Sequence, residues 1–350
     1  MNNPIIQEDL RTITGSGLKW ELFEGKTVLI TGAGGFLPSY MVETLLYLND
    51  HVLKNKALLI CLVRNRRKAE ARFAGSLSRN DFILLVQDVC EKIELDFKVD
   101  YIIHAASQAS PKYYGKDPVG TLLPNVLATA NLLDLAKTDK AAGFLFFSSG
   151  EVYGEMGDKI PTKETDFGFV DPAEVRSCYA ESKRMGENMC VSWHRQYGVP
   201  AKIIRPFHTY GPGMDLEDGR VFADFVSDIV HGRNIVMKSD GSARRSFCYL
   251  ADATTGFFTV LLKGKNGQAY NVGNDKGEIS ILGLAELLIG LFPEKALTVT
   301  KMGEIRQEGY LMSRIVRNCP EISKVRSLGW EPRVSLEEGF KRTVRSFLCD

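Results

Sequence analysis

Short apolar runs alternate with segments whose apolar residues recur at helical spacing along the first 205 residues of this chain. Strands are predicted for the runs at residues 28–30, 57–63, 82–86, 101–103, 144–147 and 201–205. Residues 41–48 and 122–136 predict helices with an apolar stripe. This alternation of strands and helices predicts an α/β fold with a doubly wound parallel sheet.

A glycine-rich turn, Thr31-Gly32-Ala33-Gly34-Gly35-Phe36-Leu37, lies between the first predicted strand and the first predicted helix. Glycines let the backbone turn sharply and approach a pyrophosphate, which the N-terminus of the next helix then stabilises. Pro38 stands where a further glycine is usual, and the first turn of a helix tolerates it. We interpret the turn as a dinucleotide site that includes Gly32, Gly35, Phe36 and Leu37; the alternative is an ordinary strand-to-helix turn.

Other strand ends supply further candidates for the cofactor site, namely Arg64, Asp88, Val89, Ala105 and Ala106. An acidic residue after the second strand normally binds the adenosine ribose, but here the strand runs into Arg64 and a basic stretch. Arg64 can pair with a 2′-phosphate, which favours NADP over NAD; a solvated basic loop is the alternative. Asp88 is placed to contact adenine, and we interpret His104 as structural.

Polar residues follow the fifth strand, and in an open α/β sheet this edge faces the ligand crevice. Ser149 and Glu151 lie there. Further along, Tyr179 and Lys183 are four residues apart and therefore share one face of a helix. We expect the Lys183 ammonium to lower the pKa of the Tyr179 phenol, which makes Tyr179 a candidate base.

The pattern divides the chain into an N-terminal extension (1–25), a dinucleotide-binding domain (26–205) and a mainly substrate-binding lobe (206–350). Proline and glycine interrupt the start of this lobe, and we expect the chain to return to the larger domain at about 242–262. Arg220 and Arg245 in the lobe suit a diphosphate. The alternative for each arginine is a surface ion pair.

Composition narrows the possible functions. With 44 basic and 43 acidic residues the net charge is only +1, which argues against a general nucleic-acid binder. The seven cysteines are scattered and the five histidines do not cluster, so we expect reduced thiols, a cytoplasmic location and no metal site. We also expect no membrane association, because no long apolar run and no signal-peptide profile stand out.

Together these residues resemble the extended short-chain dehydrogenase/reductase superfamily, in its nucleotide-sugar epimerase/dehydratase family, from about Lys26 to the C-terminus. The branch that the chain resembles most is UDP-glucuronate decarboxylase. The motifs that resemble this branch are Ala109–Pro118, Cys178-Tyr179, Lys183-Arg184, Asp218–Val221, Arg245–Tyr249, Ile322–Lys324 and Leu328–Pro332. The resemblance implies a Rossmann fold with a smaller C-terminal substrate-binding lobe, NAD as cofactor, a nucleotide-sugar substrate and a homodimer formed through helices at 122–136 and 177–196.

The resemblance also implies roles for individual residues. Tyr179 would be the base, Lys183 its ribose-binding partner, and Ser149 the residue that holds the sugar 4-hydroxyl. The remaining residues with implied roles are Glu151, where decarboxylases keep a glutamate; Tyr114, near the substrate carboxylate; Arg245, which binds substrate and helps to protonate the product carbon; and Arg220, at the diphosphate. His208 replaces an asparagine that contacts the sugar or its phosphate in the family.

Three functional hypotheses follow from the resemblance. The first is decarboxylation of UDP-glucuronate or a related nucleotide-linked uronic acid through transient oxidation at C4. The second is epimerisation of a nucleotide sugar, for which His208 could mark a reshaped pocket. The third, a non-catalytic nucleotide-binding redox sensor, is disfavoured by the retained Tyr179 and Lys183. Dehydration is disfavoured because Gly150 stands where 4,6-dehydratases have an aspartate.

Overall fold

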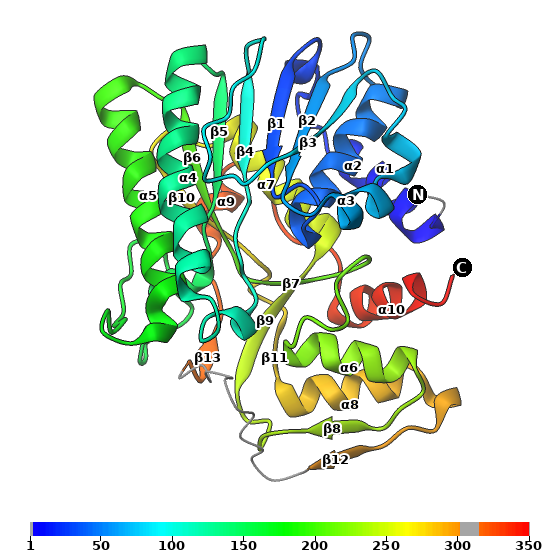
Figure 1. Cartoon of the computed structure of the whole chain (residues 1–350). Helices are drawn as coiled ribbons and strands as arrows, with labels where there is room; N and C mark the ends of the chain where they lie inside the picture. Colours follow the sequence, from blue (N-terminus) through cyan, green and yellow to red (C-terminus); the bar gives the residue numbers. More distant parts are fainter. Residues whose placement is uncertain (1–2, 302–314, 350) are drawn as a thin grey trace.

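The computed structural model of the chain describes residues 3–301 and 315–349. Its largest layer is a seven-stranded parallel sheet in the order β10-β6-β5-β4-β1-β2-β3 (Figure 1). The strands are β1 (Thr27–Thr31), β2 (Leu58–Val63), β3 (Phe82–Val86), β4 (Tyr101–His104), β5 (Gly143–Phe147), β6 (Ala201–Pro206) and β10 (Ala269–Val272). The order runs outward on both sides of β1 and β4, so the predicted doubly wound α/β fold is confirmed.

Helices cover both faces of this sheet (Figure 1). The helices around it are α1 (Pro4–Thr14), α2 (Phe36–His51), α3 (Arg66–Arg72), α4 (Pro118–Asp139), α5 (Cys178–Tyr197), α7 (Leu250–Lys263) and α9 (Ser323–Arg326). Alternate residues of a strand point to opposite faces. In β5, Phe144 and Phe146 pack with α4 and α5, whereas Leu145 and Phe147 pack with α2 and α7. Burial on both faces makes the strands continuous apolar runs, which is why their positions could be predicted.

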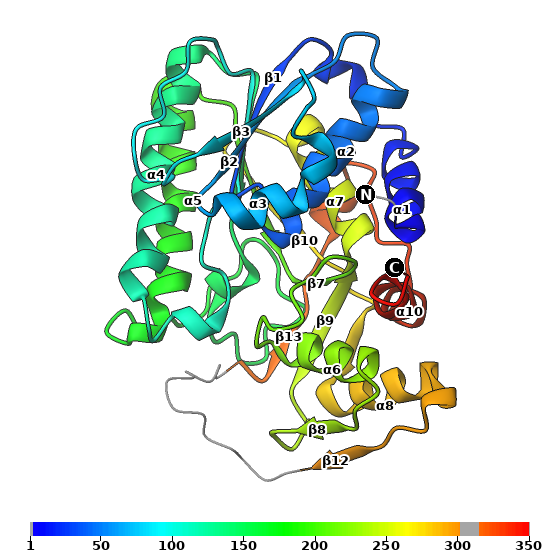
Figure 2. The ribbon, with the colours of Figure 1, turned by 45° about the vertical axis from the view of Figure 1, so that its right-hand side comes forward.

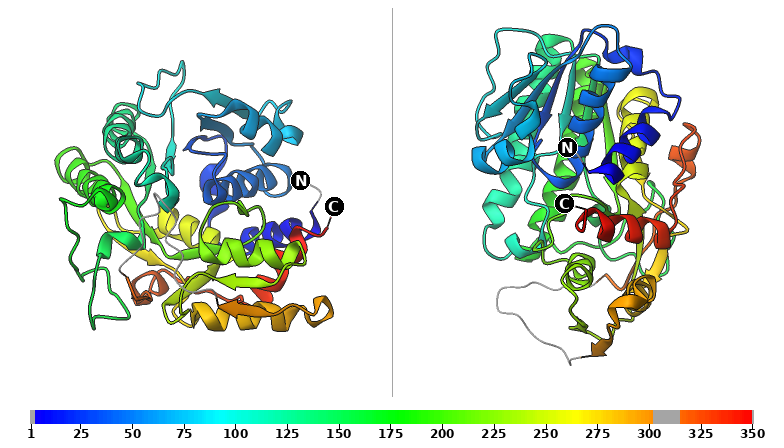
Figure 3. Two further views of the ribbon diagram at one scale, coloured as in Figure 1. Left: turned by 60° about the horizontal axis from the view of Figure 1, so that its bottom comes forward. Right: turned by 90° about the vertical axis from the view of Figure 1, so that its right-hand side faces the viewer.

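A smaller lobe lies next to the carboxyl edge of the sheet, at the bottom of the view in Figure 1. Its elements are β7 (His208–Tyr210), α6 (Val221–Val230), β8 (Ile235–Met237), β9 (Arg244–Tyr249), β11 (Glu278–Ser280), α8 (Ile281–Leu291), β12 (Val299–Lys301), β13 (Arg317–Asn318) and α10 (Leu336–Ser346). Strand β9 is the centre of a four-stranded sheet and pairs with β7, β11 and β13. Helices α6 and α8 lie side by side under it (Figure 3).

The chain passes between the two parts more than once. β9 belongs to the smaller sheet, and the helix that follows it, α7, packs on the large sheet. Strand β10 then pairs with β6 at the edge of the large sheet, beyond the return predicted at about 242–262. The return thus reaches Val272, while the division into domains itself stays a prediction.

The N-terminal and C-terminal helices lie together against the junction of the two parts (Figure 2). The Asn3 side chain caps α1 by accepting from the backbone N–H groups of Ile5 and Ile6. Its Nδ2 also donates to the Ser346 carbonyl oxygen, 2.8 Å away in α10. The predicted N-terminal extension is therefore an integral helix of the fold.

Helix α4 departs from one expectation drawn from the sequence. Among residues 3–301 and 315–349 it is the one helix long and apolar enough, by length and composition, to cross a membrane. Its apolar composition has a simpler explanation in the fold, because α4 packs on β4 and β5 and along α5. Its outer face still exposes Val119, Leu123 and Leu127 at intervals of four residues.

Candidate active site

The glycine turn has a backbone shape that side chains would obstruct. Gly32 has φ +65°, and a Cβ atom there would lie 2.7 Å from the Cα atom of Ala106. Gly35 is the N-cap of α2 without any side-chain capping bond, and Pro38 lies within the first turn of that helix. The N–H groups at the start of α2 are therefore available to phosphate oxygens, so the residues present fit a dinucleotide.

The strand ends predicted to bind the cofactor lie along the same carboxyl edge. Ala105 and Ala106 are half-buried beside the glycine turn, Phe36 and Leu37 are half-buried at the start of α2, and Val89 is buried. The Asp88 carboxylate accepts the Cys90 N–H at 2.9 Å. Arg64 is exposed after β2. The geometry thus gathers these candidates at one edge, and their contacts with a cofactor stay predictions.

His104 holds this edge together. Its Nδ1 lies 2.8 Å from the Thr31 hydroxyl, and its Nε2 lies 3.0 Å from the Pro124 carbonyl oxygen. The Thr31 hydroxyl in turn accepts the Ala106 N–H at 3.2 Å. Burial lowers the pKa of His104 to about 3, so the ring is neutral. Its role is to fix the ends of β1 and β4 beside the glycine turn.

Tyr179 and Lys183 lie on the same helix, as predicted, and Ser149 at the end of β5 meets the Tyr179 phenol. Tyr179 and Lys183 lie on α5 and are buried, and a hydrogen bond joins Ser149 to the Tyr179 phenol. Lys183 Nζ is 5.7 Å from the centre of the Tyr179 ring, and it donates to the Phe147 carbonyl oxygen at 2.6 Å. The arrangement can hold a hydroxyl group between Ser149 and Tyr179.

The expected lowering of the Tyr179 pKa is wrong for this structure. Burial raises the pKa of Tyr179 to about 12, and the hydrogen bond from Ser149 offsets this only in part. Burial likewise lowers the pKa of Lys183 to about 7, while the charge of Glu187 acts in the opposite direction. Desolvation is the largest cause of both shifts, because both groups are enclosed, and neither group is among the charges that shift the pKa of the other.

The lowered pKa of Lys183 predicts a pH dependence of stability. Between the folded value of about 7 and the ordinary value of 10.5, the unfolded chain binds the proton that the folded protein releases. Stability should therefore rise with pH across this window. We expect the rise in Tm from pH 7 to 9 to be smaller in Lys183→Met than in the wild type, measured without added nucleotide. Equal pH dependence in both proteins would contradict this expectation.

Behind the catalytic edge lies a buried network that the sequence did not suggest. Glu187 Oε2 accepts from Arg205 Nη2 at 2.6 Å, and the Ser148 hydroxyl donates to Glu187 Oε1 at 2.5 Å. Arg205 also donates to the Tyr153 hydroxyl at 2.8 Å. Glu187 follows Lys183 by one helical turn, and this spacing was the available signal. The network joins β5, β6 and α5 at the catalytic edge.

Tyr114 stacks on Tyr179, with ring centres 5.1 Å apart and planes 15° apart. Its hydroxyl donates to the Ala109 carbonyl oxygen at 3.0 Å. The guanidinium of Arg176 lies 5.8 Å from the centre of the Tyr114 ring and donates to Glu151 Oε2 at 3.2 Å. Arg176 was not predicted, because only the fold brings it to Glu151.

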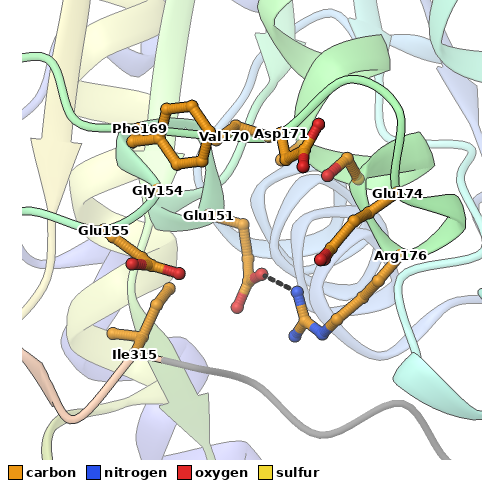
Figure 4. A pocket seen from close by; sticks show the side chains of 11 residues that line it. Glu151, Gly154, Glu155, Phe169, Val170, Asp171, Glu174, Arg176 and Ile315 are labelled. Carbon is orange, nitrogen blue, oxygen red and sulfur yellow. Dashed lines mark hydrogen bonds and ion pairs between the residues drawn. The ribbon is translucent and has the colours of Figure 1, made fainter.

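A pocket opens on the outer side of Glu151 and Arg176 (Figure 4). It is lined by Glu151, Gly154, Glu155, Phe169, Val170, Asp171, Glu174, Arg176, Ser177, Ala180 and Ile315. Tyr179 does not line the pocket itself, but Ala180 follows it on α5, and the charge of the lining residue Glu151 acts on its phenol, so the pocket lies near the candidate base. Among the described residues, no group of three or more His, Cys, Asp or Glu side chains could hold a metal ion.

The arginines predicted for the diphosphate meet near His208. His208 pairs with Phe247 across β7 and β9, so Arg245, two residues before Phe247, lies on the same face. Arg245 Nη2 donates to the Ile315 carbonyl oxygen at 2.7 Å, and Arg220 pairs with Asp218. Burial, followed by the charges of Arg245 and Arg220, lowers the pKa of His208 well below its ordinary value.

A glycine turn on a doubly wound sheet, with a tyrosine and lysine four residues apart at its carboxyl edge, defines a nicotinamide-dependent class of enzymes. The model of the NAD dependent epimerase/dehydratase family matches residues 28–273, and the chain belongs to this family. It is a nucleotide-sugar modifying enzyme.

Individual relatives and solved structures are similar to this chain over most of its length. The chain is 36% identical over 328 residues to UDP-glucuronic acid decarboxylase 6 of Arabidopsis thaliana, covering 91% of this chain and 88% of that protein. The UDP-glucose 4-epimerase of Thermotoga maritima has a similar fold, with a TM-score of 0.77 and 24% identity over 92% of this chain and 98% of that one. The UDP-glucuronic acid 4-epimerase of Bacillus cereus, solved with UDP-glucuronic acid and NAD, gives a TM-score of 0.76 and 22% identity over 92% and 99%.

Proposed function

We propose that this enzyme decarboxylates a nucleotide-linked uronic acid, UDP-glucuronate first among the candidates, through transient oxidation at C4. The observation that carries the proposal is that the Tyr179 phenol meets Ser149 within the influence of the Glu151 charge, and that Glu151 also lines a pocket. The similarity to UDP-glucuronic acid decarboxylases over 91% of the chain supports it.

NAD is the cofactor that we propose, and when bound it supplies a hydride acceptor for C4 and later returns the hydride. Gly32, Gly35 and the start of α2 would hold its pyrophosphate. Ala105 and Ala106 would lie against it, and Asp88 would contact its adenine. NADP is the alternative, because Arg64 stands in the place of a ribose-binding acid.

The side chains of this chain would move the protons. In its deprotonated form, Tyr179 Oη takes the proton of the 4-hydroxyl, which Ser149 holds. Oxidation at C4 turns the uronic acid into a β-keto acid. The bond between C5 and the carboxylate then breaks, CO2 leaves, and the electron pair forms an enolate. A proton that comes from the solvent is added to C5 on the side of Glu151 and Arg245, and Tyr179 returns its own proton to O4 when C4 is reduced.

The direct test is mass spectrometry and proton NMR of the purified protein incubated with UDP-glucuronate. We expect a product lighter by CO2, and a strong loss of this product in Glu151→Gln. A product of unchanged mass with new coupling constants would instead establish epimerisation. Mass spectrometry of any cofactor released by heating the protein would show whether it is NAD or NADP.

Epimerisation remains the second candidate, and one observation favours it. His208 replaces the asparagine expected from the decarboxylase resemblance. Intact turnover in Glu151→Gln would favour a C4 epimerase that needs only Tyr179. A non-catalytic redox sensor is the remote third alternative, and unchanged biological activity of Tyr179→Phe would support it.

We also propose that the enzyme is a homodimer that pairs α4 and α5 with those of a second copy. The outer faces of these helices expose large apolar side chains: Val119, Leu123 and Leu127 on α4, and Met185 and Val191 on α5. Large apolar side chains that are exposed on two helices packed against each other are typical of an interface.

An arginine in the middle of this surface tests the dimer. Leu127 is 45% exposed on α4. In the proposed dimer, the Leu127→Arg substitution would bury a charge between the paired helices, so we expect this variant to be a monomer in sedimentation velocity. Leu22, 41% exposed on the N-terminal segment, is the matched control, and Leu22→Arg should leave the dimer intact. A monomeric wild type, or a dimeric Leu127→Arg protein, would refute the proposed interface.

A further inference from the structure

The pocket beside Tyr179 contains a cationic group to which neither the sequence motifs nor the proposed reaction gave a role. We infer that Arg176 binds the carboxylate of the substrate and thereby selects uronic acids over neutral sugars. The inference rests on the proposed function, because it places the sugar with its 4-hydroxyl at Tyr179.

An ion pair, a ring contact and a ring stack place Arg176 near the candidate base. Its side chain is 19% exposed and forms an ion pair with Glu151, whose side chain is 25% exposed, at 3.2 Å. Its guanidinium also faces the ring of Tyr114, which stacks on Tyr179. Arg176 therefore lies one stacked ring away from the candidate base, and its guanidinium lines the pocket with Glu151 (Figure 4).

Sugar chemistry brings the carboxylate to this neighbourhood. In a uronic acid the carbon that bears the carboxylate is bonded to C4, which carries the hydroxyl group. When Tyr179 and Ser149 hold the 4-hydroxyl, the carboxylate carbon therefore lies two bonds from C4. Glu151, two residues after Ser149, borders the pocket on this side, and Arg176 is its partner.

The other charges of the pocket make Arg176 decisive. Its lining carboxylates are Glu151, Glu155, Asp171 and Glu174, and Arg176 is the only cationic side chain among the described lining residues. An anionic sugar would be repelled by these carboxylates unless it lay against the guanidinium. A guanidinium has five N–H donors in a planar fork, so one arginine can serve Glu151 and a second carboxylate.

Binding measured without turnover tests the inference. In a Tyr179→Phe background, isothermal titration would give the Kd of UDP-glucuronate and of UDP-glucose, and of the corresponding thymidine diphosphate sugars. With Arg176 intact we expect the uronate to bind more tightly than the neutral sugar. Arg176→Gln should weaken the binding of the uronate by roughly 10- to 100-fold, which is the range for a charged hydrogen bond. The Kd of the neutral sugar should stay nearly unchanged.

Two further variants separate recognition from a structural role. Glu151→Gln in the same background removes the competing carboxylate, so the uronate should bind at least as tightly as before. Arg195→Gln changes an exposed arginine on the same helix and should alter neither Kd. The inference would be overturned if Arg176→Gln weakened the binding of both sugars equally. It would also be overturned if the protein with Arg176 intact did not prefer the uronate.

The outcome also distinguishes this inference from the proposed reaction. A preference for the uronate that depends on Arg176, in an enzyme whose wild type releases no CO2, would keep the inference and refute decarboxylation. If the wild type releases CO2 but Arg176→Gln does not change the affinity for the uronate, decarboxylation would be supported and the inference about Arg176 would be refuted. Failure of all four nucleotide sugars to bind would refute both.

Discussion

Replacing Tyr179 by phenylalanine should lower kcat by about 10²- to 10⁴-fold, the range that general acid–base groups contribute. The phenol is the group that meets Ser149 at the end of β5, and its ring is fixed by the stack with Tyr114. Phenylalanine keeps that ring and its packing while it removes the proton acceptor. The fold, the Tm and the affinity for the nucleotide sugar should therefore change little, and the loss should appear in kcat.

Steady-state kinetics on the sugar that the wild type converts would check this, together with a melting curve. Tyr197→Phe is the matched control, because Tyr197 ends the same helix but is exposed. It should retain full activity. A Tyr179→Phe enzyme within tenfold of the wild type would mean that another group takes the proton, and the assignment of Tyr179 as base would be lost.

The raised pKa of Tyr179 also predicts how the rate should depend on pH. A phenol whose pKa is raised to about 12 by burial is protonated at neutral pH, and so is not ready to act as a base in this structure. The rate should therefore rise with pH below the pKa that applies in the complex. This pH dependence should vanish from any residual rate of Tyr179→Phe.

Much of the fold could be predicted from the sequence, because the inner strands of the large sheet are buried and therefore form continuous apolar runs. These inner strands are covered on both faces, so runs such as Phe144–Phe147 are apolar at every position, whereas the edge strand β3 is partly exposed. The glycine turn between β1 and α2 was also visible, because only glycine suits the close approach of Gly32 to Ala106. Pro38 did not break the turn, since it falls within the first turn of α2.

Other features were hidden because they depend on contacts between distant segments. Strand β10 is a four-residue run after a helix, and only its pairing with β6 makes it part of the large sheet. Arg176 and Arg184 look alike in the sequence near Tyr179. The fold directs Arg176 to Glu151, whereas Arg184 donates to the carbonyl oxygens of Val152 and Gly168.

The lowered Tyr179 pKa was mispredicted for a related reason. Spacing along a helix shows that two side chains share a face, but it does not show how deeply they are enclosed. Here the Lys183 ammonium donates to the Phe147 carbonyl oxygen, and burial dominates the pKa values of both groups. Desolvation depends on the whole surrounding structure, so the sign of such a shift needs coordinates.

Removing the carboxylate of Asp9 should be among the most destabilising single changes in this protein. Asp9 lies on α1, is buried, and accepts hydrogen bonds from Tyr40 of α2 and Tyr249 at the end of β9, both at 2.7 Å. Arg342 of α10 donates to its other oxygen at 2.8 Å. One carboxylate therefore ties both terminal helices to the large domain and to the smaller sheet.

Asp9→Ala would leave two hydroxyl groups and a guanidinium without this acceptor in a nearly closed site. Breaking a buried ion pair on one side costs about 3–5 kcal/mol, which corresponds to a fall in Tm of roughly 5–15 °C. Differential scanning calorimetry of wild type and variant would measure it. The effect should be present at neutral pH, where the rest of the network is intact.

Glu8 provides a matched control one residue away. It binds the same guanidinium, Arg342, at 2.9 Å, but its side chain is 56% exposed, whereas that of Asp9 is 4% exposed. Solvent screens such a pair, so Glu8→Ala should cost no more than about 1 kcal/mol. If the two variants lost equal stability, the charge of Arg342 rather than the buried position of Asp9 would decide the strength of the contact. A large difference would show that the N-terminal helix is held through Asp9, in a segment that precedes the region matched by the family model.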